Sequence, residues 1–184
     1  MSLMEKTGTP LGSYAPDFEL PAIDDSVHHL SRYLETCRCV AVVFMCNHCS
    51  YVRLYLDRLK QIQAEFHDRG FTVIGINSND ASQYPEDSFE NMKKFATQED
   101  LNFPYLWDPT QDVAFCFGAH KTPEAFLIDN QGILLYRGGI DDNAQDPEAV
   151  KDRYLREAIA SLMEGSAVTP RATETIGGSL KWRQ

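Results

Sequence analysis

Two cysteines, Cys46 and Cys49, are separated by two residues and lie between a strand-like and a helix-like segment of the sequence. Residues 40–45 are apolar, partly β-branched and free of alternation, a pattern typical of a strand covered on both faces. From residue 52 to residue 66, apolar side chains recur every three or four positions, the spacing of one helical face. The unpaired N–H groups at the start of a helix favour a thiolate over a thiol. We therefore expect Cys46 to be a nucleophilic sulfur.

A second sulfur one helical turn further on suits thiol–disulfide exchange, in which Cys46 attacks a partner disulfide and Cys49 resolves the mixed disulfide. One alternative is half of a zinc site, which requires two further ligands. No second C-x-x-C and no H-x-x-x-H exists among the other candidates, which are Cys37, Cys39, Cys116, His48 and His120. Another alternative, a buried structural pair, is disfavoured by the polar Asn47 and His48 between the cysteines. We expect redox chemistry, with no metal and no cofactor beyond the Cys46–Cys49 disulfide.

The composition, with 184 residues of which 43% are hydrophobic and 24% charged, is that of one soluble globular domain. A net charge of −10 argues against a nucleic-acid partner, because phosphates would be repelled. The N-terminus lacks the apolar core of a secretory signal, and no stretch reaches membrane-spanning length. We therefore expect a cytoplasmic protein without a membrane partner. A second methionine, Met4, follows closely on Met1, and removal of a leader peptide stays open as an alternative. Five cysteines, an odd number, also fit a reducing compartment with one working pair.

The sequence divides into an arm, one domain and a tail. Residues 1–16 contain two glycines and two prolines and predict an irregular N-terminal arm. Residues 17–165 hold the periodic apolar segments and predict the domain. Residues 166–184 are rich in Thr, Gly and Pro and predict a C-terminal tail without a core of its own.

Within the domain, the order of elements predicts a mixed sheet. A strand at residues 71–76 follows the long helix, and a right-handed crossover makes it parallel to the strand before the cysteines. Apolar runs at 125–128 and 133–137 flank a Gly-containing bend and predict an antiparallel hairpin. A last helix is expected to begin at Pro147 and to end at Gly165.

Three local patterns give further expectations. Asp87 followed by Glu90 is similar to a capping box and predicts a helix start. Cys37 and Cys39 flank the entry to the central strand, where we expect inert, buried thiols. Cys116 stands among apolar residues, and we expect it to be a small apolar filler.

The order of strand, C-x-x-C, long helix, parallel strand, Thr-Pro, hairpin and final helix resembles the thioredoxin-like redoxins of the AhpC/TSA and TlpA-like type. The motifs at residues 44–49, 77–88 and 177–182 are similar to those of a bacterial group within these redoxins. The resemblance implies an α/β, thioredoxin-like fold with a central mixed β-sheet flanked by helices on both faces and an N-terminal β-hairpin extension.

The same resemblance assigns roles to further residues. It implies a cis Thr122–Pro123 bond lying against the disulfide, with backbone that would pair with a substrate strand. His48 is the nearest titratable group for stabilising the Cys46 thiolate, and Arg53 or Glu124 is expected to contribute. Asn47 and Thr122 are expected to be supporting residues of the site. In oxidoreductases, a His between the cysteines makes the disulfide a better oxidant, so we expect a more oxidising potential than that of a thioredoxin with Pro there.

The chain also departs from its relatives. Many members of the group carry extra cysteines where Lys121 and Gly178 stand, so no relay through further thiols is expected. The carboxylates that thioredoxins and TlpA-like proteins place near the cysteines correspond to Val40 and Val52, so neither proton acceptor is present.

Three functions compete at this point. The first is a dithiol oxidoreductase acting on protein or small-molecule disulfides, with Pro123 as the platform for the substrate. The second is a thiol peroxidase, but the Pro-x-x-x-Thr-x-x-Cys loop of peroxiredoxins would need Thr and Pro where Val43 and Cys39 stand. The third is a metal-binding or redox-sensing module that uses the same two thiols.

Overall fold

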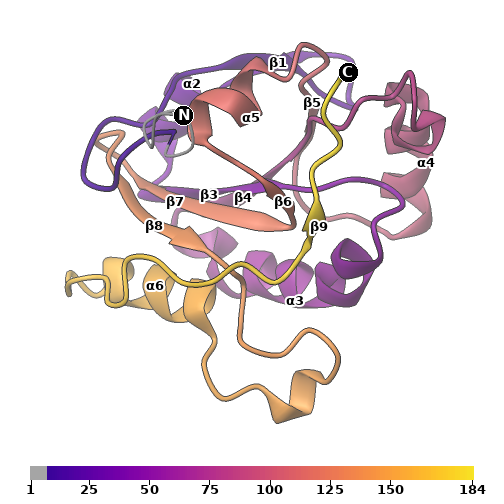
Figure 1. Ribbon diagram of the computed structural model, residues 1–184. Coiled ribbons are helices and arrows are strands. Elements are labelled where there is room, and N and C mark those ends of the chain that lie inside the picture. Colours follow the sequence, from indigo (N-terminus) through magenta and orange to yellow (C-terminus); the bar gives the residue numbers. More distant parts are fainter. Residues whose placement is uncertain (1–7) are drawn as a thin grey trace, which may run out of the picture.

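The computed structural model of the chain describes residues 8–184, which fold around a five-stranded mixed sheet (Figure 1). β3 lies at the centre and pairs parallel with β4 and antiparallel with β7. This confirms the predicted mixed sheet. In spatial order the strands are β5 (Tyr105–Trp107), β4 (Phe71–Asn77), β3 (Cys39–Phe44), β7 (Glu124–Asp129) and β8 (Leu134–Gly138).

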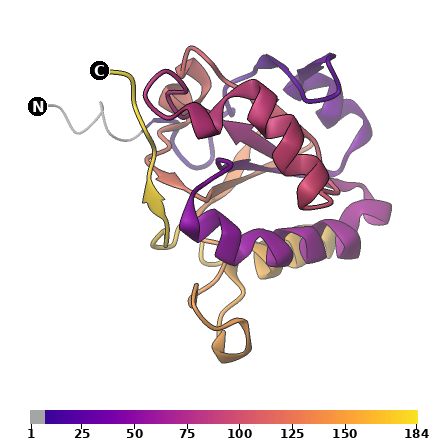
Figure 2. The same ribbon diagram turned by 90° about the vertical axis from the view of Figure 1, so that its right-hand side faces the viewer.

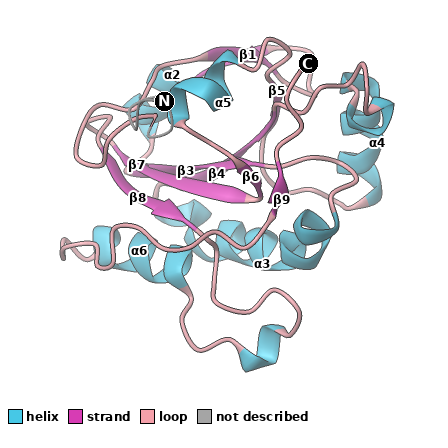
Figure 3. Cartoon of the chain, in the orientation of Figure 1, coloured by secondary structure: helices cyan, strands magenta, loops and turns pink. Residues whose placement is uncertain are grey.

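Helices cover both faces of the sheet (Figures 1 and 3). Side chains of β3 alternate between two cores because successive strand residues point to opposite faces. Cys39, Ala41 and Val43 pack with residues of α3 and α6, whereas Val40, Val42 and Phe44 pack with residues of α2 and α5. The helices are α2 (Leu30–Thr36), α3 (Ser50–Phe66), α4 (Phe89–Gln98), α5 (Asp112–Phe117) and α6 (Tyr154–Met163), with 3₁₀ turns η1 (His67–Arg69), η2 (Pro85–Asp87) and η3 (Pro147–Ala149). None of the helices within residues 8–184 is long and apolar enough to cross a membrane.

The predicted N-terminal hairpin is also confirmed. β1 (Glu19–Pro21) and β2 (Val27–His29) pair antiparallel, and an isolated bridge joins Ala22 to Leu106 in β5. Of the arm at residues 1–16, the described part begins at residue 8, and Tyr14 bridges Ile133.

The last helix begins later than predicted. Pro147 opens only a 3₁₀ turn, and α6 starts at Tyr154. The Asp142 carboxylate accepts hydrogen bonds from the backbone N–H groups of Lys151, at 3.0 Å, and Asp152, at 3.3 Å. These bonds hold the chain in a loop where the sequence suggested helix, and the loop projects from the body of the protein (Figure 2).

The C-terminal segment packs on the domain. β9 (Gly178–Ser179) pairs antiparallel with β6 (Lys121–Thr122), the short strand just before Pro123. Leu180 is buried in the core, and Figure 1 shows the segment running alongside the sheet towards the C-terminus. The tail is therefore part of the structure that surrounds Thr122.

The environment of Cys116 differs from the prediction. Ala114 and Phe117 of α5 face the core, whereas Phe115 and Cys116 between them are exposed. In a helix, residues three apart share a face, so the residues between two buried positions point to solvent. Cys116 is an exposed free thiol, not an apolar filler.

Candidate active site

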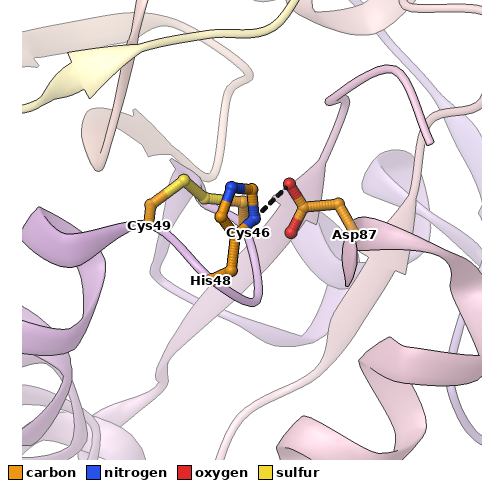
Figure 4. Close-up of side chains that lie close together, drawn as sticks. All are labelled: Cys46, His48, Cys49 and Asp87. Carbon is orange, nitrogen blue, oxygen red and sulfur yellow. Dashed lines mark ion pairs between the residues drawn. A yellow bond between two sulfur atoms is a disulfide. The ribbon is translucent and has the colours of Figure 1, made fainter. Parts of the chain in front are cut away.

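The cysteine pair occupies the turn between β3 and α3. The ladder of β3 continues for one residue, because Met45 N–H donates to the Ile76 carbonyl at 2.9 Å. The helix begins at Ser50, and Cys49 is its N-cap residue. Cys46 and Cys49 form a disulfide with Cα atoms 5.8 Å apart (Figure 4). Cys46 has no exposed surface and Cys49 is partly exposed, so it is Cys49 that stands at the helix start.

Asn47, a predicted supporting residue, fixes the conformation of this turn. Its side-chain amide donates to the Glu86 carbonyl at 3.0 Å, and its side-chain oxygen accepts from the Tyr105 hydroxyl at 2.7 Å. Its carbonyl oxygen accepts from Arg53 at 3.0 Å. Burial, and secondarily the charge of Asp87, raises the pKa of Tyr105 well above its usual 10, so this hydroxyl remains a donor.

The buried carboxylate of Asp87 lies beside the pair and was not predicted as a site residue. One carboxylate oxygen accepts the backbone N–H of Asn47 at 2.8 Å, and the other accepts the side-chain amide of Asn79 at 2.9 Å. The helix start predicted at Asp87 is instead capped by Ser88, whose hydroxyl accepts from Asn91 N–H at 3.2 Å. Asp87 thus brings a carboxylate to the cysteines from a different part of the chain than in thioredoxins or TlpA-like proteins.

His48 lies between this carboxylate and the sulfurs (Figure 4). Its Nδ1 atom is buried and lies 2.8 Å from an Asp87 oxygen, but it makes no hydrogen bond. The imidazole stacks on the Tyr84 ring, with centroids 6.2 Å apart and planes inclined by 14°. The Lys181 ammonium lies 5.7 Å from the centre of the same ring.

Two side chains donate towards the Cys49 sulfur. The Thr122 hydroxyl lies 3.4 Å from it and the Asn79 amide nitrogen 3.8 Å from it. Thr122 Oγ1 is also 3.8 Å from the Cys46 sulfur. The bond from Thr122 to Pro123 is cis, as the resemblance implied.

Arg53 and Glu124 support the site through the backbone. Arg53 donates to the Asn47 carbonyl and pairs with Glu99 at 3.2 Å, while Glu124 accepts from the N–H groups of His120 and Lys121 at 2.8 and 3.1 Å. Glu124 therefore holds the loop that leads into Thr122. Both residues position the turn and the loop instead of pairing with a sulfur.

Residues 11–137 match the family described as AhpC/TSA. The chain belongs to the AhpC/TSA family. Among proteins of known sequence, this AhpC/TSA protein is 27% identical to the thiol-disulfide oxidoreductase ResA of Geobacillus thermodenitrificans, over 70% of this chain and 68% of ResA. It is 26% identical to the thiol:disulfide interchange protein DsbE of Escherichia coli K12, over 80% of this chain and 77% of DsbE.

Solved structures similar to this AhpC/TSA protein have the same overall fold. An uncharacterized conserved protein from Geobacillus kaustophilus is 38% identical, with a TM-score of 0.88 over 95% of this chain and 93% of the other. A putative DsbE from Chlorobium tepidum is 26% identical, with a TM-score of 0.64 over 85% and 96% of the two chains.

The sequence placed Cys46, Asn47, His48, Cys49 and Thr122–Pro123 together, and the structure of this AhpC/TSA protein brings them to one place. It adds Asp87, Asn79, Tyr84 and Tyr105, which the sequence analysis left out. The motif at residues 77–88 was the available signal, since it supplies Asn79, Tyr84 and Asp87.

Proposed function

We propose that this AhpC/TSA protein is a thiol–disulfide oxidoreductase that exchanges electrons with the disulfides or thiols of partner proteins or small molecules. The observation that carries the proposal is the Cys46–Cys49 disulfide at the strand-to-helix junction, with the Thr122 hydroxyl 3.4 Å from the Cys49 sulfur and a cis bond from Thr122 to Pro123. The similarity to ResA and DsbE supports the same reaction class. The reaction needs no cofactor other than the two sulfurs.

In the proposed exchange, a partner thiolate attacks the Cys46 sulfur, a bond forms between them, and the Cys46–Cys49 bond breaks. The electron pair goes to the Cys49 sulfur, which leaves as a thiolate. A second partner thiolate then attacks the partner's own sulfur and releases Cys46, so the partner dithiol is oxidised and the protein disulfide is reduced. The opposite direction follows the same steps in reverse.

The contacts of the two sulfurs support this division of roles. Hydrogen-bond donation to a thiolate stabilises it, and a more stable thiolate leaves faster. The Thr122 hydroxyl and the Asn79 amide both donate towards Cys49, which also lies at the positive end of α3. Cys46 has no exposed surface in the disulfide form, so a partner thiolate can attack it only after neighbouring side chains move.

Trapping the mixed disulfide tests the proposal. A Cys49→Ser variant is expected to retain a partner thiol on Cys46, because the resolving sulfur is absent. A Cys46→Ser variant is expected to trap much less, and Cys116→Ser, which alters an exposed cysteine outside the pair, should reduce insulin disulfides like the wild type. If the Cys46→Ser and Cys49→Ser variants both reduced insulin as fast as the wild type, the proposal would be contradicted. If a partner were trapped only on Cys49, the roles of the two cysteines would be reversed.

We also propose that the protein works in a reducing compartment such as the cytoplasm. Cys37, Cys39 and Cys116 are free thiols, which is what such a compartment maintains. Alkylation of intact cells before lysis, followed by mass spectrometry of the protein, would test this. Three alkylated cysteines outside the pair are expected, and oxidation of Cys116 in most molecules would contradict the proposal.

A further inference from the structure

Four side chains of the site supply metal-binding atoms at close range. One ligand atom each from Cys46, His48, Cys49 and Asp87 lies within 4.8 Å of the other three. Two thiolate sulfurs, an imidazole nitrogen and a carboxylate oxygen are ligands that zinc takes in proteins. Bonds of zinc's usual length put tetrahedral ligands roughly 3.5 Å apart. After reduction the two sulfurs would therefore move apart, and the ligand atoms that are farther apart than this would move closer together.

The surroundings of His48 are a second, independent indication of a metal site. Its Nδ1 atom is buried and has no hydrogen-bond partner, although the Asp87 oxygen is only 2.8 Å away. A buried nitrogen without a partner costs free energy unless something binds its lone pair or its proton. A cation between the imidazole, the carboxylate and the sulfurs would satisfy it.

The carboxylate is already held in place for such a role. The Asn47 N–H and the Asn79 amide hold Asp87 by hydrogen bonds of 2.8 and 2.9 Å. Bonds of this kind orient metal ligands and are part of a working site. His48 is about one-third exposed, so a cation can enter from solvent on its side.

We propose that the reduced form of this protein binds one divalent cation of zinc's type through Cys46, His48, Cys49 and Asp87. The inference rests on the proposed function in one respect, since the disulfide must be reducible. A reductant with two thiols reduces the disulfide and is itself oxidised to a disulfide. The cation then replaces the two thiol protons, which are released, and forms two metal–thiolate bonds.

Metal binding and disulfide exchange exclude each other at this site. Both sulfurs bind the cation, so neither is available to attack or to leave. Oxidation of the pair by a partner disulfide removes two of the four ligands and releases the cation. The site therefore couples the redox state of the pair to the availability of the metal.

The test uses the full chain, reduced with a phosphine and desalted without oxygen, and begins with a count of free thiols. Zn²⁺ is then titrated in competition with a chromophoric chelator. We expect one Zn²⁺ per reduced chain and none per oxidised chain. Co²⁺ should give the visible absorption of a tetrahedral site together with sulfur-to-metal charge-transfer bands.

Matched variants identify the ligands. Asp87→Asn and His48→Gln are each expected to weaken Zn²⁺ binding about tenfold or more. Asp57→Asn and His67→Gln make the same chemical changes at exposed positions and should bind like the wild type. Variants that fold poorly are recognised by circular dichroism, and in that case the Co²⁺ spectrum of the wild type alone decides the geometry.

Two outcomes would overturn the metal site. One is a reduced wild-type chain that binds no Zn²⁺ or shows no tetrahedral Co²⁺ spectrum. The other is unchanged affinity in both Asp87→Asn and His48→Gln, which would mean that the cysteines bind metal without them. A disulfide that the phosphine or a dithiol cannot reduce would appear in the thiol count before metal is added, and it would contradict the proposed function instead.

Discussion

The carboxylate of Asp87 accepts the backbone N–H of Asn47 at 2.8 Å, across 40 residues of sequence. This bond satisfies a buried donor within the turn that joins the two cysteines. Asp87 also places its carboxylate next to His48, which lies beside the disulfide. The shape of the turn and the charge around it therefore depend on one side chain contributed by η2.

Replacing Asp87 by alanine tests the structural part of this relationship. Asp87→Ala leaves the Asn47 N–H and the Asn79 amide without their acceptor in a buried place. A buried donor without a partner costs about 1–3 kcal/mol, so we expect the free energy of unfolding of the oxidised protein to fall by at least that amount. Urea denaturation measures it, and the exposed Asp57→Ala is the control. Equal stability of the two variants would contradict the prediction.

The hydroxyl of Tyr105 stabilises the same turn through a hydrogen bond to Asn47. It donates to the Asn47 side-chain oxygen at 2.7 Å in a fully buried place. Tyr105→Phe removes only this oxygen and leaves the acceptor unpaired, so we expect a loss of about 1–3 kcal/mol in unfolding free energy and slower reduction of insulin. Tyr14→Phe, at an exposed ring, should change neither quantity. A Tyr105→Phe protein with full stability would show that water or a neighbour replaces the hydroxyl.

His48 is predicted to make the disulfide more oxidising, by favouring the thiolate form of the pair. His48→Pro and His48→Gln should therefore lower the reduction potential by about 30 mV, the shift that corresponds to ~1.4 kcal/mol for two electrons. Equilibration with glutathione in the presence of a metal chelator measures the potential. His67→Gln, at an exposed histidine, should leave it unchanged. An unchanged or higher reduction potential in both His48 variants would contradict the prediction that His48 makes the disulfide more oxidising.

The reactive pair and the sheet could be predicted because their signals are local. The apolar run before Cys46 and the helical spacing after Cys49 each lie within a few residues, and both elements formed where the patterns indicated. The role of Asp87 has no such signal. An acidic residue three positions before a glutamate resembles a helix cap, and only the fold shows that the carboxylate turns back towards Asn47 while Ser88 caps the helix.

The pairing of β9 was missed for a related reason. Gly178–Ser179 is too short to show a period of its own, and it becomes a strand only because Lys121 and Thr122 are beside it. Composition alone predicts a tail for such a segment. Long-range contacts of this kind follow from the topology of the whole chain and cannot be read from spacing.

The three unpaired thiols are predicted to differ in reactivity. Burial raises the pKa of Cys39 to about 12, so almost none of it is thiolate at pH 8, whereas Cys116 is exposed. Iodoacetamide at pH 8 should modify Cys116 first in the oxidised native protein and leave Cys39 unmodified until a denaturant is added. Peptide mass spectrometry measures the order. Rapid native modification of Cys39 would show that its strand opens.

Two adjacent glycines test whether the C-terminal segment matters to the site. A Cβ on Gly177 would lie 2.8 Å from the Thr122 carbonyl oxygen, but a Cβ on Gly178 would meet nothing within 4 Å. Gly177→Ala should therefore displace β9 from β6, cost about 1–3 kcal/mol of stability and slow disulfide exchange, because Thr122 donates to the Cys49 sulfur. Gly178→Ala is the matched control and should affect exchange little. Urea denaturation and insulin reduction measure both variants, and equal rates would mean that the position of Thr122 does not depend on the C-terminal segment.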